Sequence, residues 1–228
     1  MSGRATPVLM TSLAAGYVVC AQLGAHTRFA WLCALAVAML ALAALLPALT
    51  RGSAIAIVVA FAVLVLIALA VMAGAPRLPG YFVPPLLLAA VAWFFARTLA
   101  PSSRPLIARI VQALDGEEFA AQPVVARYAY RLTLFWAVLL SVLALGALVL
   151  AFCVVPDGVL AMAGQSTALS LSPAQWSHWV NLGGYGSVAV AFAGEFALRQ
   201  MILPQAPKRS FVDFARRVAT LWPELRQP

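Results

Sequence analysis

Long apolar runs separated by short polar breaks dominate the chain. An apolar helix of about 20 residues is long enough to cross the hydrocarbon core of a bilayer. The pattern predicts six such helices, at residues 7–24, 30–49, 54–74, 81–96, 132–155 and 176–198. Thr11, Ser12 and Gln22 interrupt the first run, so five spans remain the alternative. We therefore expect one all-α, polytopic membrane helix bundle of 228 residues.

The polar breaks between the runs differ in charge. Residues 97–131 form the longest polar interruption before the basic tail 199–228. Of the fifteen lysine and arginine residues, only Arg28 and Arg77 lie in the loops that follow spans one, three and five. Because cytoplasmic loops are enriched in lysine and arginine, we expect the loop 97–131, the tail and both termini in the cytoplasm.

The composition excludes an ordinary soluble domain. Hydrophobic residues make up 64% of the chain, charged residues 10%, and the mean hydropathy is +0.96. The net charge of +8 comes from cations beside the apolar runs, so it indicates membrane orientation and not nucleic-acid binding. Cys20, Cys33 and Cys153 lack metal-ligand spacing, and we expect them to pack inside helices. A disulfide between outer helix ends stays open.

Two short amphipathic surface helices are expected, at residues 105–114 and 211–222. For the first, Ser102 or Ser103 is the expected N-cap and Gly116 the expected end. Each helix either lies in the membrane interface or packs on the cytoplasmic ends of the spans. Both arrangements create a basic platform under the inner leaflet, formed by Arg97, Arg104, Arg109, Arg127, Arg131, Arg216 and Arg217.

Glu195 is the one acidic residue inside a predicted span. Arg199 follows one helical turn later on the same face, and Asn181 lies close to that face. A carboxylate in a membrane can carry protons, act as a base or anchor a substrate cation. Its position one turn from the membrane boundary favours a structural ion pair with Arg199, because a carboxylate near the interface is inexpensive.

The chain lacks the motifs of common enzymes. It has no G-x-S-x-G elbow, no P-loop and no G-x-G-x-x-G turn. His26, His178 and Asp157 lack the spacing of metal ligands, so we expect no metal and no cofactor. Catalytic residues stay unknown, and the protein is not expected to be an autonomous enzyme.

Four segments of the chain resemble a family of small, uncharacterised bacterial inner-membrane proteins. They are R-T-L-A-P-S-S-R-P-L-I-A-R-I, A-R-Y-A-Y-R-L-T-L-F-W, G-E-F-A-L-R and K-R-S-F-V-D-F-A-R-R-V. Members are encoded among fatty-acid-synthase-like genes, including clusters for aryl polyene pigments such as xanthomonadin. Some carry a "ketosynthase" label, which does not fit this chain because it has no Cys-His-His arrangement. The resemblance implies a bacterial inner membrane and acyl chains on an acidic carrier protein.

Three functions are compatible with these features. In the first, the basic platform of an accessory membrane protein docks an acidic acyl carrier protein or a soluble synthase. In the second, Glu195, Arg199 and Asn181 line the path of a lipid or polyene flippase. In the third, a membrane acyl transfer enzyme holds a phosphopantetheine or phospholipid phosphate with Arg97, Arg104 or Arg131. The partners expected are the bilayer and the carrier protein, and homo-oligomerisation stays open.

Overall fold

The computed structural model describes residues 5–26, 29–165 and 168–202. In these ranges every regular element is helical, apart from an isolated bridge between Val154 and Leu171. The all-α fold predicted from the apolar runs is thus confirmed. The expected tail helix 211–222, with Arg216 and Arg217, lies outside the described residues.

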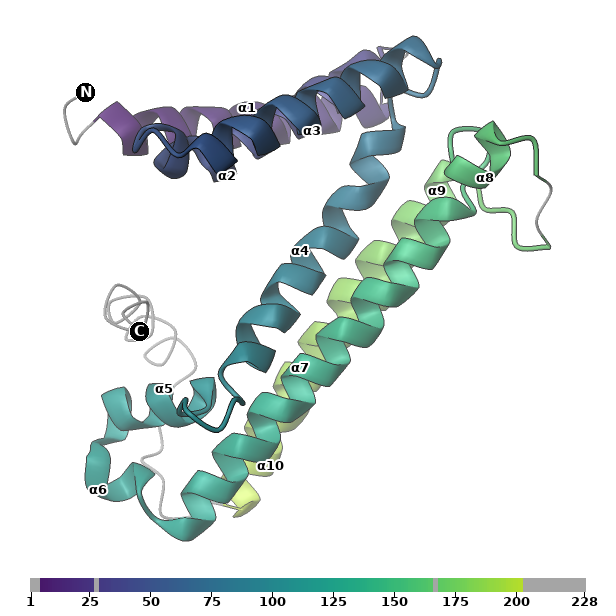
Figure 1. Cartoon of the computed structure of the whole chain (residues 1–228). Helices are drawn as coiled ribbons and strands as arrows, with labels where there is room; N and C mark the ends of the chain where they lie inside the picture. The colour runs from purple at the N-terminus through teal and green to yellow at the C-terminus, as the bar shows by residue number, and fades with distance from the viewer. Residues whose placement is uncertain (1–4, 27–28, 166–167, 203–228) are drawn as a thin grey trace. The chain divides into compact units, whose positions relative to one another are not determined.

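Within the described residues, five helices are long and apolar enough to cross a membrane. They are α1 (Ala5–His26), α2 (Trp31–Leu49), α3 (Ala54–Met72), α4 (Leu78–Arg97) and α7 (Pro123–Phe152) (Figure 1). Side chains such as Ile55 and Met72 are largely exposed on these helices. Apolar exposure of this extent suits contact with lipid, where a helix satisfies all its backbone hydrogen bonds internally.

The sixth expected span, 176–198, is helical but divided. It consists of α9 (Pro173–His178), a π-helix η1 (Trp179–Tyr185) and α10 (Gly186–Ile202), which follow one another without a break. No part reaches the length of a span by itself, so the count of six spans stays a prediction. Wide π turns of this kind often mark functional positions in helices.

Helix α7 begins well inside the stretch expected to be a loop. Its 30 residues extend about 45 Å at 1.5 Å per residue, whereas the hydrocarbon core is about 30 Å thick. About ten residues must therefore extend beyond the core. The short helices α5 (Leu106–Asp115) and α6 (Glu117–Ala120) precede α7, and α8 (Val159–Met162) follows it.

The chain forms two compact units, each described here by itself. The first contains the residues up to Pro85 together with Leu148–Ser177, and the second contains Leu86–Ala147 and the residues from His178 onward. In the first unit, α1 packs on α2 and α2 packs on α3.

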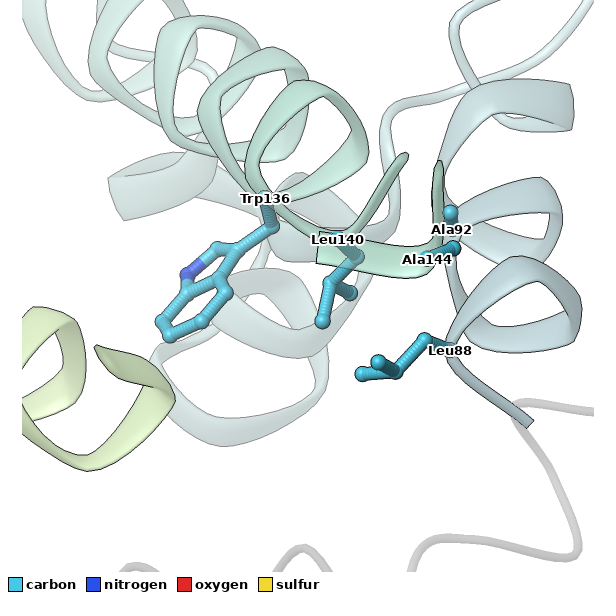
Figure 2. Packing of buried hydrophobic residues seen from close by; sticks show 5 residues of the cluster. All are labelled: Leu88, Ala92, Trp136, Leu140 and Ala144. Carbon is cyan, nitrogen blue, oxygen red and sulfur yellow. The ribbon is translucent and has the colours of Figure 1, made fainter. Parts of the chain in front are cut away.

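A compact apolar cluster forms the core of the second unit. Leu88 and Ala92 of α4 meet Trp136, Leu140 and Ala144 of α7 (Figure 2). Val188 and Ala191 of α10 pack against the same cluster. This core joins α4, α7 and α10 within the second unit.

Candidate functional site

Helix α5 is tied at its N-terminus by two buried threonines. The Leu106 N–H donates to Thr98 Oγ1 at 3.0 Å, and the Ile107 N–H donates to Thr133 Oγ1 at 3.3 Å. Both hydroxyls also donate to carbonyls of their own segments. The first N–H groups of a helix have no partner within it, so these two bonds replace a local cap.

The expected N-cap of α5 is therefore wrong. The position belongs to Pro105, which makes no side-chain cap, and neither Ser102 nor Ser103 caps the helix. Thr133 lies 26 residues from Ile107 in sequence. The expected end at Gly116 is confirmed, since Gly116 has φ +90° and its N–H donates to the Gln112 carbonyl at 3.0 Å.

The apolar face of α5 packs on protein. Val111 and Val125 are buried together, and Ile107, Phe119 and Tyr128 pack around them. Of the two arrangements expected for this helix, packing against the ends of the spans is the one observed. Helices α5 and α6 thus pack against the start of α7.

A buried ion pair holds the C-terminal end of α5. Arg199 Nη2 of α10 lies 3.7 Å from Asp115 Oδ2, and the Asp115 side chain is only 2% exposed. A charge so deeply buried depends on its partner, because removal of one partner leaves the other desolvated and uncompensated. The pair therefore joins α5 to α10.

Glu195 receives a hydrogen bond from a residue that the sequence did not suggest. The Tyr128 hydroxyl of α7 donates to Glu195 Oε1 at 2.9 Å. Pairing with Arg199 was the expected structural role of Glu195, whereas the contacts seen are Tyr128 to Glu195 and Arg199 to Asp115. Tyr128 and Asp115 both come from the stretch 97–131, which was treated as a loop. Glu195 is thus half-buried and joined to α7 within the second unit.

The predicted platform arginines differ in their surroundings. Arg104 bonds to Gln112 at 2.7 Å and pairs with Glu117 at 3.4 Å, and Arg97 lies 4.5 Å above the centre of the Phe94 ring. Arg109 is half-buried on α5.

Arg127 and Arg131 of α7 are exposed, as Arg97 and Arg104 are, but they differ from those two in their contacts. They lie one turn apart, and neither makes a hydrogen bond or an ion pair with another described residue. Both lie in the first third of α7, within ten residues of its start at Pro123.

Asn181, the third intramembrane polar residue expected, lies in the π-helix η1 and is exposed. Close by, the Ser187 hydroxyl donates to the Gly183 carbonyl. This bond links residues four apart on the face that also carries Glu195. Asn181 and Glu195 are not shown to share one polar site.

The histidine, cysteine and acidic side chains of the described residues do not gather in groups of three. No three His, Cys, Asp or Glu side chains lie close enough there to hold an ion. Cys20, Cys33 and Cys153 are free thiols in this structure.

Comparison with known proteins supplies no identity. The chain matches no protein-family model, no curated protein and no solved structure. Function must therefore be inferred from the chemistry of the residues themselves.

Proposed function

We propose that this protein is a multi-pass inner-membrane accessory protein that docks an acidic soluble partner at its basic cytoplasmic end. The observation that carries the proposal is the pair Arg127 and Arg131. Both guanidinium groups are exposed and lie on one side of a helix that extends past the hydrocarbon core. A guanidinium group is well suited to bind carboxylates and phosphates.

The rigid setting of these arginines supports docking. Helix α5 is held at one end by Thr98 and Thr133 and at the other by Arg199. A prearranged surface loses less conformational entropy on binding than a mobile one. The partner thus meets two exposed cations on α7, a helix that packs against the held helix α5.

Acyl carrier protein is the partner class that we propose. It is acidic, and the family resemblance implies acyl chains on such a carrier. Docking would bring a carrier-bound acyl or aryl polyene chain to the inner leaflet, where an apolar product is soluble. Glu195 is engaged with Tyr128 in the described structure, which favours a bracing role for it over a transport path.

The experiment measures binding of acylated carrier protein to the full chain in nanodiscs. We expect Arg127→Glu/Arg131→Glu to weaken binding at low salt by on the order of tenfold or more, because it replaces attraction by repulsion. Binding by the unaltered protein should weaken as salt rises. The control is Arg51→Glu, since Arg51 is exposed in the turn between α2 and α3. Equal binding by the double variant and the unaltered protein would refute the docking role.

A further inference from the structure

A second polar cluster lies in the first unit, around the start of α4. It consists of Arg77, Tyr81, Asp157 and Trp176. Arg77 Nη1 lies 3.7 Å from Asp157 Oδ2, and the rings of Tyr81 and Trp176 meet edge to face with centroids 4.9 Å apart. Arg77 and Asp157 are also the charged groups that act on the Tyr81 hydroxyl. These contacts bring together three segments that are far apart in sequence.

Polar atoms in this cluster are buried without hydrogen bonds. Tyr81 is 5% exposed and Trp176 is 8% exposed. The Tyr81 Oη, Trp176 Nε1 and Asp157 Oδ2 atoms meet no described residue at hydrogen-bond distance and angle, although the Asp157 carboxylate lies near enough to the Tyr81 hydroxyl to interact with it. Buried polar groups normally have partners, because desolvation without compensation is costly. Three such atoms in one cluster indicate that an external group completes it.

The chemistry of these atoms defines the missing group. An indole N–H can only donate, and a carboxylate can only accept, whereas a hydroxyl group can do both. The charges of Arg77 and Asp157 cancel, so the cluster favours a neutral group over an ion. A hydroxyl oxygen that accepts from Trp176 and donates to Asp157 meets both requirements.

The position of the cluster at helix ends indicates which molecule supplies that hydroxyl. Arg77 and Tyr81 lie at the start of α4, and Trp176 lies at the start of the helical stretch 173–202. Tryptophan and tyrosine at such helix ends are typical of the headgroup region of a bilayer. The Arg77 side chain is 36% exposed, so the cluster reaches the surface of the first unit at this residue.

We propose that this cluster binds the free hydroxyl of a neutral lipid headgroup. Diacylglycerol is the simplest lipid with such a group. A buried water offers the same hydrogen bonds, and the experiment below separates the two sources. The site is distinct from the docking surface on α7 and does not depend on it.

The first experiment uses the unaltered protein and two matched lipids. Phosphatidylcholine nanodiscs contain either diacylglycerol or the same lipid with its free hydroxyl acetylated. We expect diacylglycerol to raise the Tm by about 2–4 °C, with no rise from the acetylated lipid, because acetylation removes the donor. An equal rise with both lipids, or no rise with either, would overturn the proposal and leave water as the partner.

The second experiment tests the named donor. Trp176→Phe keeps an aromatic ring and removes only the N–H group, so the rise with diacylglycerol should be lost. Trp179→Phe is the control, since Trp179 is 61% exposed and lies three residues away. A full rise in Trp176→Phe would contradict the site. If Trp176→Phe does not fold, the lipid comparison on the unaltered protein still decides.

Discussion

Two arginine–aspartate pairs, one in each unit, have the same separation but different surroundings. Both nitrogen–oxygen distances are 3.7 Å. Asp115 is almost fully buried and its partner Arg199 comes from α10, whereas Arg77 is 36% exposed. Beside one pair, the Tyr128 hydroxyl has Glu195 as its acceptor, whereas beside the other the Tyr81 hydroxyl has no hydrogen bond within the described residues. The ion pair in the second unit thus holds α5 against α10. The ion pair in the first unit lies among buried polar atoms that have no hydrogen bond of normal geometry.

The largest expected effect is the loss of the more deeply buried pair. Arg199→Leu should lower the free energy of unfolding by about 3–5 kcal/mol, because Asp115 is left buried and charged. Arg77→Leu should cost less, on the order of 1–2 kcal/mol, because the Arg77 side chain is 36% exposed and the Asp157 side chain 15% exposed, so solvent screens part of this pair. Denaturant unfolding in nanodiscs measures both values. Adding Asp115→Asn to Arg199→Leu should recover part of the lost stability. Equal losses for Arg199→Leu and Arg77→Leu would contradict the difference in burial between the two ion pairs.

Replacement of Tyr128 and Tyr81 by phenylalanine should change the free energy of unfolding by a smaller amount, and the two changes should differ in sign. Tyr128→Phe should destabilise by about 1.5–3 kcal/mol, because it removes a hydrogen bond to a charged group. Tyr81→Phe should be neutral or stabilise by up to about 1 kcal/mol, because it removes a buried hydroxyl without a partner. The measurement requires a detergent without hydroxyl groups, which would otherwise fill the cluster. Destabilisation of similar size in both variants would contradict the contrast.

The smallest effect concerns the tied N-terminus of α5. Thr133→Val keeps the shape of the side chain and removes the hydroxyl, so it should cost about 1–2 kcal/mol, as the loss of a helix cap does. Thr133→Ser keeps the hydroxyl and should retain most of that stability. Thr50→Val serves as the control, because the Thr50 hydroxyl bonds only locally and is exposed. A cost as large for Thr50→Val as for Thr133→Val would show that Thr133 does not act through α5.

Much of the helical pattern is readable in the sequence, and one missed boundary left a signal there. The buried residues of α7 recur at helical spacing through Val125, Ala129, Thr133 and Trp136. This repeat crosses the basic stretch without a change in phase, so it indicates that the helix begins before residue 132. The arginines on the exposed face of α7 lower the average hydropathy of this stretch. An average of hydropathy alone therefore predicts a loop where the helix begins.

The pairings of the candidate site left no comparable signal. Glu195 and Arg199 are one turn apart, which favours a local ion pair in any reading of the sequence. Packing of α7 and α5 against α10 instead offers Tyr128 and Asp115. Similarly, serine is a favoured N-cap residue, which made Ser102 and Ser103 candidates. In the structure the N–H groups at the start of α5 donate to the hydroxyls of Thr98 and Thr133.

The sequence by itself determined the helical class, the membrane character and the distribution of cations along the chain. In lipid each span must satisfy its backbone groups within itself, so local hydrophobicity is sufficient to define it. Tertiary structure alone decided which buried polar groups meet. Tyr128 and Glu195 lie 67 residues apart, and a contact across that distance depends on how helices pack. The same packing leaves the Tyr81 hydroxyl and the Trp176 N–H without a hydrogen bond of normal geometry among the described residues. It is at these two groups that we expect a ligand.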